Sequence, residues 1–152
     1  MKRSLLLLSC LALLNSARAA ALPDFKAQDQ NGKSWSLADA SSKPMLVDFW
    51  ATWCVPCLKS IPDLKAFHKK HGAKIQLLGA ATDLKGWDKV KPAIAKYKID
   101  YPVIIVKGEL AEAYGVEGYP SLKVVKNGKI VKSLLGKHSL KDLEKELAEY
   151  LR

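Results

Sequence analysis

Residues 47–57 are Val47-Asp48-Phe49-Trp50-Ala51-Thr52-Trp53-Cys54-Val55-Pro56-Cys57, a dense apolar run that leads directly into a pair of cysteines. The segment 45–50 has the composition of a strand that is buried on both faces of a sheet. From Cys57 to about residue 71, apolar residues recur at helical spacing. We therefore expect a strand, a short turn and a helix, with Cys54 at the start of the helix.

The expected position of Cys54 has chemical consequences. A thiol that caps a helix receives free backbone N–H groups and the positive end of the helix dipole, and both stabilise the thiolate. Pro56 has no N–H, so the N–H of Cys57 is the main donor that remains. Cys57 lies one turn into the helix, more buried and within reach of the Cys54 sulfur. Attack on a disulfide by Cys54 can then be followed by resolution through Cys57.

Two other uses of the cysteine pair are weaker. A structural disulfide between residues this close in sequence closes almost no loop and removes little unfolded-state entropy. A zinc site would draw on His68 and His71, but the histidine spacings fall below the zinc-finger pattern and a helix follows Cys57 at once. We expect redox chemistry by the cysteines, with neither a metal nor a bound cofactor.

Asp48 lies in the strand that should be buried on both faces. An ionised carboxylate there is costly, so its pKa should rise. A buried acid just behind the resolving thiol can exchange protons with Cys57, through water. The alternative is an aspartate at a loosely packed strand end that faces solvent. We expect the catalytic role.

The N-terminus has the features of an export signal. A positively charged start is followed by the apolar run 5–14, which is shorter than the roughly 20 residues that span a bilayer, and by small residues at 17–19. We expect residues 1–20 to be a cleaved signal peptide and residues 22–152 to form one domain in a periplasmic or other extracytoplasmic location. The alternatives are a retained anchor and a lipid on Cys10.

Composition narrows the function further. The net charge of the 152-residue chain is +10, and removal of Lys2, Arg3 and Arg18 with the signal leaves +7. The remaining lysines are scattered along the chain, with no basic run interleaved with aromatics, so we expect no nucleic-acid partner. Only two cysteines stay in the processed chain. An exported protein that places its only cysteines with two residues between them is better suited to redox chemistry than to a structural bridge.

The remaining elements alternate between strands and helices. Asn-Gly pairs predict tight hairpins at both ends of the domain, and Ser139 with Asp142 predicts the start of the last helix. Alternating strands and helices imply parallel pairing in the middle of the sheet. We expect an α/β fold with a central mixed sheet, helices on both faces and an N-terminal hairpin. The expected segments are a hairpin at 25–37, strands at 75–81 and 101–106, helices at 87–97 and 109–114, a hairpin at 121–135 and a helix from 139 to 150.

The segment 47–57, followed by Pro62, resembles the active site of the thioredoxin superfamily, and the order of elements is similar over 25–151. With an N-terminal hairpin, Phe-Trp-Ala-Thr-Trp-Cys-x-Pro-Cys resembles the membrane-facing TlpA/ResA group of bacterial reductases. The resemblance implies a thioredoxin-like fold and a protein thiol–disulfide oxidoreductase whose redox-active disulfide joins Cys54, the attacking cysteine, to Cys57, the resolving one. Asp48 matches the buried acid of thioredoxins.

The resemblance also implies a substrate surface. An X–Pro bond is trans by default, but Pro120 matches a cis-proline that faces the cysteines in the family. Substrate-binding positions are implied at Trp53, Val55, Pro56, Tyr119 and Pro120. The sequence departs from the family pattern in two places. The strand 75–81 has neither the lysine of thioredoxins nor the glutamate of some reductases, and Tyr119 is bulkier than the common residue.

The function expected from the resemblance is an exported reductant of protein disulfides, with apocytochrome c or metallochaperones as candidate substrates. Its partner for re-reduction would be a membrane-embedded electron donor of the DsbD/CcdA type. The alternatives are a disulfide oxidase or isomerase, and a non-catalytic copper carrier that uses the cysteine pair.

Overall fold

The computed structural model of the protein describes residues 21–152, so the predicted signal peptide lies outside the described residues. Within 21–152, no helix is both long enough and apolar enough to cross a membrane. The elements in chain order are β1 (Lys26–Gln28), β2 (Ser34–Ser36), a 3-10 turn η1 (Leu37–Ala40), β3 (Met45–Trp50), α1 (Val55–His71), β4 (Gln76–Ala81), α2 (Trp87–Tyr97), β5 (Val103–Ile105), α3 (Gly108–Ala113), β6 (Ser121–Lys126), β7 (Lys129–Leu135), α4 (Leu140–Glu146) and a 3-10 turn η2 (Ala148–Tyr150).

The five-stranded sheet has the order β5-β4-β3-β6-β7. Strand β3 is parallel to β4, and β4 is parallel to β5. Strand β6 runs antiparallel to β3 and to β7. Helices α1 and α2 provide the long crossovers that parallel neighbours require, and β6 and β7 are joined by a tight turn. The expected mixed sheet is confirmed, and β3, which leads to the cysteines, is its central strand.

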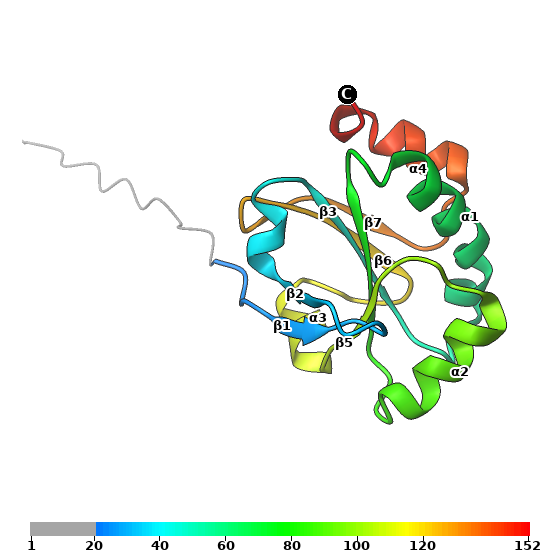
Figure 1. Cartoon of the computed structure of the whole chain (residues 1–152). Helices are drawn as coiled ribbons and strands as arrows, with labels where there is room; N and C mark the ends of the chain where they lie inside the picture. The colour runs from blue at the N-terminus through cyan, green and yellow to red at the C-terminus, as the bar shows by residue number, and fades with distance from the viewer. Residues whose placement is uncertain (1–20) are drawn as a thin grey trace, which may run out of the picture.

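Both faces of the sheet are covered, but by different elements (Figure 1). Helices α1, α2 and α4 pack on one face, where Phe67 and Leu143 are fully buried. Helix α3, η1 and the hairpin β1–β2 pack on the other, around Phe49 and Tyr114. Because successive side chains of a strand point to opposite faces, β3 contributes Leu46 and Trp50 to the first core and Phe49 to the second.

The N-terminal hairpin is present, but its loop differs from the two-residue turn that Asn31-Gly32 predicts. Gln28 pairs with Ser34, so residues 29–33 form the loop. The Asp29 carboxylate organises it, because Oδ1 accepts the N–H of Asn31 at 2.8 Å and Oδ2 accepts the Trp35 indole N–H at 2.9 Å. Burial alone would raise the pKa of Asp29, but the hydrogen bonds from Trp35 and the backbone outweigh it and hold the pKa below its ordinary value.

The second hairpin follows its prediction. Lys126 pairs with Lys129, and the two intervening residues, Asn127 and Gly128, have φ values of 50° and 72°. These left-handed conformations are the ones a two-residue hairpin turn requires, and Asn-Gly tolerates them best.

The last helix begins as predicted. The Ser139 hydroxyl accepts the N–H of Asp142 at 3.2 Å, and the Asp142 carboxylate accepts the N–H of Ser139. It ends at Glu146, earlier than residue 150, and the short turn η2 follows it.

Strand β5 is shorter than the predicted 101–106. The side-chain amide of Gln30, in the hairpin loop, takes the place of a neighbouring strand at its outer edge. Gln30 Nε2 donates to the carbonyl of Tyr101 at 3.0 Å, and the N–H of Val103 donates to Gln30 Oε1 at 2.8 Å. The amide thus links the hairpin to the segment that carries Tyr101 into the core.

Candidate active site

The two cysteines lie at the N-terminus of α1 and form a disulfide. Cys54 is the N-cap, and its sulfur accepts the backbone N–H of Cys57 at 3.2 Å. Pro56 occupies the first turn and has no N–H to add. Cys54 is 5% exposed and Cys57 2% exposed, whereas Val55 between them is 57% exposed. The predicted capping arrangement is therefore present.

An aspartate that the sequence interpretation did not single out holds the turn before Cys54. The Thr52 N–H donates to Asp83 Oδ2 at 3.0 Å, and the Thr52 hydroxyl donates to Asp83 Oδ1. Asp83 follows β4, and Thr52 follows the neighbouring parallel strand β3. Carboxyl ends of parallel strands meet at one edge of a sheet, so a polar residue just after each strand was the available clue.

Asp48 lies in the middle of β3 and is 3% exposed. Within residues 21–152, its Oδ1 has no hydrogen-bond partner. Burial away from water raises the pKa of Asp48 to about 7. The predicted burial and the predicted direction of the pKa shift are both found, and the carboxyl can exchange a proton near neutral pH.

A small cavity of about 10 Å³ lies next to Asp48, lined among others by Ser60 of α1, Pro120 before β6 and His138 before α4. A single water molecule needs roughly 10–15 Å³. Ser60 is one helical turn beyond Cys57 and therefore on the same side of α1. The cavity thus connects the surroundings of Asp48 with the helix face that carries the resolving cysteine.

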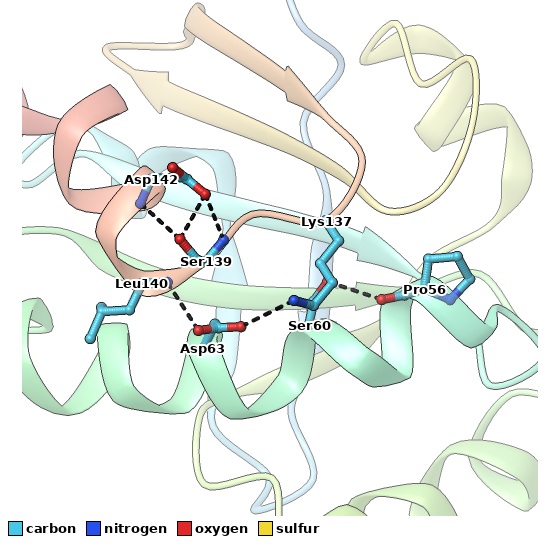
Figure 2. A network of polar contacts seen from close by, with 7 residues as sticks. All are labelled: Pro56, Ser60, Asp63, Lys137, Ser139, Leu140 and Asp142. Atoms are coloured by element: carbon cyan, nitrogen blue, oxygen red, sulfur yellow. Dashed lines mark hydrogen bonds and ion pairs between the residues drawn. The ribbon is translucent and has the colours of Figure 1, made fainter.

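Figure 2 shows polar contacts of α1 and of the segment that leads into α4, two parts of the chain that contribute residues to the lining of this cavity. The Ser60 hydroxyl donates to the Pro56 carbonyl at 3.0 Å, within the first turns of α1. Further along α1, the Asp63 carboxylate accepts the N–H of Leu140 at 3.0 Å and contacts the Lys137 ammonium at 3.6 Å. These contacts hold the loop between β7 and α4, which carries His138, against α1.

An exposed tryptophan and a half-buried tyrosine form an aromatic pair next to Cys54. Trp53 is 67% exposed, and its ring meets that of Tyr119 edge-on, with the centroids 5.7 Å apart. The Tyr119–Pro120 peptide bond is cis, and the Pro120 carbonyl accepts the N–H of Gly136 at 2.9 Å. Four of the five residues implied as substrate contacts therefore border the cysteines or contact a residue that does: Trp53, Val55, Pro56 and Tyr119.

The histidines considered for zinc lie elsewhere. His71 Nε2 is 2.8 Å from Glu144 Oε1 at the end of α1, and the His68 ring packs against Tyr101. Among residues 21–152, no three histidine, cysteine, aspartate or glutamate side chains gather in a way that would hold a metal ion.

Comparison with known proteins places this site in a family. The model of the Redoxin family matches residues 17–150. The thiol-disulfide oxidoreductase ResA of Bacillus thuringiensis subsp. konkukian is 35% identical over 136 residues, which cover 86% of this chain and 74% of that protein.

Two solved structures are similar over nearly their whole length. A thiol:disulfide interchange protein of Chlorobium tepidum is 27% identical with a TM-score of 0.74, covering 88% of this chain and 97% of that one. The exposed lipoprotein thioredoxin of Streptococcus pneumoniae is 32% identical with a TM-score of 0.73, covering 84% and 99%. The chain belongs to the Redoxin family, and within the thioredoxin superfamily it is a TlpA/ResA-like protein thiol–disulfide oxidoreductase.

Proposed function

We propose that this oxidoreductase is exported through residues 1–20, which are then cleaved, and that it reduces disulfides of partner proteins outside the cytoplasm. Apocytochrome c and metallochaperones are the candidate substrates, and a membrane-embedded donor of the DsbD/CcdA type restores the dithiol. The likeness to an exposed lipoprotein thioredoxin supports the location. The likeness to the oxidoreductase ResA supports the chemistry.

The cycle starts from the reduced pair. The Cys54 thiolate attacks one sulfur of the substrate disulfide, which forms a mixed disulfide and releases the first substrate thiolate. Cys57 loses its proton and attacks the Cys54 sulfur, which releases the second substrate thiolate and forms the Cys54–Cys57 disulfide. Two electrons pass to the substrate, and the oxidised enzyme has the disulfide described above.

Asp48 is the proton acceptor for Cys57 in this cycle. Its carboxyl is buried, has a pKa of about 7 and borders a cavity on the same side of α1 as Cys57. At neutral pH a substantial fraction is ionised and can take the thiol proton through water, and the resulting acid can return the proton to solvent.

The reducing direction rests on how little stabilises the Cys54 thiolate. Within residues 21–152, the Cys54 sulfur accepts one hydrogen bond, from the N–H of Cys57. Val55 is apolar, and Pro56 has no N–H. Stabilising this thiolate would stabilise the reduced protein and make the disulfide more oxidising. With few stabilisers, the pair should be a reductant, and this single observation carries the proposal.

The substrate surface is proposed to consist of the aromatic pair Trp53 and Tyr119 and the residues around the disulfide. Trp53 and Tyr119 offer an apolar platform beside the cysteines, and the exposed Val55 extends it. Pro56 and Pro120 complete the set, with the backbone of Tyr119 available to pair with an extended substrate segment.

The redox potential of the Cys54–Cys57 pair tests the direction. Equilibration of the protein without residues 1–20 against glutathione buffers should give a value nearer to thioredoxin, roughly −270 mV, than to DsbA, roughly −120 mV. A potential above about −160 mV would contradict the reductase and favour a disulfide oxidase or isomerase.

A further inference from the structure

Gly79 of β4 lies directly beside Asp48 of β3 in the parallel register. A Cβ atom at Gly79 would lie 3.2 Å from the indole nitrogen of Trp50, 3.2 Å from Cγ2 of Val103 and 3.3 Å from Cε2 of Tyr101. Asp48 and Trp50 are two residues apart on one strand, so their side chains share a face of the sheet. The indole of Trp50 and the ring of Tyr101 therefore lie over Gly79, on the face of the sheet to which the side chain of Asp48 points.

The polar atoms of these three side chains are all buried. Asp48 is 3% exposed, and Trp50 and Tyr101 are 1% exposed each. Within residues 21–152, Asp48 Oδ1, Trp50 Nε1 and Tyr101 Oη each lack a hydrogen-bond partner. Buried polar groups are nearly always paired, so three such atoms in side chains on one face of the sheet call for a physical explanation. One of them is an acceptor, and the other two carry donors.

We propose that Tyr101 and Trp50 are positioning residues for Asp48: their hydroxyl and indole N–H groups stabilise the ionised carboxylate that accepts the Cys57 proton. This inference rests on the role of Asp48 in the proposed function. The proton passes from the Cys57 thiol to the Asp48 carboxylate, and Tyr101 and Trp50 keep theirs throughout. Strand β4, which runs beside Asp48, has no ionisable side chain of its own. Tyr101, in the segment before β5, reaches over Gly79 of that strand instead.

The ionisation of Tyr101 agrees with a donor role. Burial, together with the charges of Asp48 and Asp100, raises the pKa of Tyr101 well above its ordinary value. The hydroxyl therefore keeps its proton at every pH at which the enzyme would work. A neutral donor in a dry site favours the charged form of a neighbouring carboxyl without competing for its proton.

Other titratable groups surround Asp48 and must be separated from the effect of Tyr101. Cys57 lies on the facing side of α1, and His138 borders the cavity from the loop before α4. The ring of His68 lies 6.3 Å from that of Tyr101. Replacing only the Tyr101 hydroxyl leaves all of these groups in place.

Tyr101→Phe is the decisive variant. The carboxyl carbon of Asp48, labelled with ¹³C and assigned with Asp48→Asn, is titrated by NMR in the oxidised and the reduced protein. Loss of the donor should raise the pKa of Asp48 by about 1 and move the pH profile of the resolving step upward by the same amount. The matched control is Tyr114→Phe, because Tyr114 is also buried but its hydroxyl donates to the Pro23 carbonyl beyond the opposite face of the sheet. Equal Asp48 titrations in wild type and Tyr101→Phe would overturn the inference.

The wild-type protein provides a second test if Tyr101→Phe does not fold. The ring resonances of Tyr101 should shift with the same midpoint as the Asp48 carboxyl, and a flat response would overturn the inference. These readouts are independent of redox direction. An oxidising potential with a clear effect of Tyr101→Phe would contradict the reductase function and support the role of Tyr101 and Trp50 beside Asp48. A reducing potential with no effect of Tyr101→Phe would support the reductase function and contradict that role.

Discussion

The backbone N–H of Cys57 lies 3.2 Å from the sulfur of Cys54 and points to it as a hydrogen-bond donor. The residue that resolves a mixed disulfide therefore also stabilises the attacking thiolate of its partner. Because Pro56 removes one further donor from the same turn, this contact and the helix dipole are the main local contributions to the acidity of Cys54.

Val55→His should make the pair more oxidising. A histidine at this exposed position adds a donor and a positive charge beside Cys54, which stabilises the thiolate and so the reduced protein. We expect the potential to rise by at least about 30 mV, which corresponds to about 1.4 kcal/mol. Glutathione equilibration measures both proteins, and Val131→His on the exposed side of β7 is the matched control. An unchanged potential would mean that the cap geometry does not govern the acidity of Cys54.

The two cysteines should fail in different ways. Cys54→Ser removes the attacking sulfur and should abolish reduction of model disulfides. Cys57→Ser should still attack but accumulate mixed disulfides, because no thiol remains to resolve them. Mass spectrometry of the trapped species identifies the bonded residue. Rapid alkylation of Cys57 in the reduced protein, with an unreactive Cys54, would reverse the two roles.

Asp48→Asn should slow the resolving step more than the initial attack. Asparagine cannot accept the Cys57 proton, whereas Cys54 reacts as a preformed thiolate. In the wild type, the rate of the resolving step should fall as the pH falls through about 7, where Asp48 becomes protonated. Stopped-flow kinetics with a substrate that gives a visible mixed disulfide separates the two steps. Equal slowing of both would exclude Asp48 from proton transfer.

Asp48→Asn should also change how stability depends on pH. The carboxyl has a pKa near 3.9 when unfolded and about 7 when folded, so between these values the folded protein binds more protons than the unfolded chain. The free energy of unfolding of the wild type should therefore fall as the pH rises from about 4 to 7. The difference is on the order of 3–4 kcal/mol. Denaturant titrations of the oxidised protein at pH 4.5 and 8 should show the variant gaining stability over the wild type at the higher pH, and a pH-independent difference would contradict the burial of a charged Asp48.

Much of the fold could be predicted because its signals are local. The apolar run of β3, the capping serine at Ser139 and the turn at Asn127 each depend on residues only a few positions apart. The predicted two-residue loop of the first hairpin was wrong. The carboxylate of Asp29 accepts backbone N–H groups of the loop, so a tight Asn-Gly turn is not needed to satisfy them.

The active site divides in the same way. The cysteines and Asp48 lie in one continuous segment, so their spacing and burial were predictable. The contact between Thr52 and Asp83 joins residues 31 positions apart. The position of Tyr101 depends on the space above Gly79. These two contacts depend on which strands become neighbours and on which side chains pack between the segments. No periodic pattern in the sequence indicates either of them.

The side-chain amide of Gln30 also protects this protein against self-association through its sheet edge. An outermost strand normally exposes a row of unpaired N–H and C=O groups, on which a foreign strand can add and start an aggregate. At the start of β5 the carbonyl of Tyr101 and the N–H of Val103 are already occupied by one side chain. This part of the sheet margin is therefore protected against strand addition.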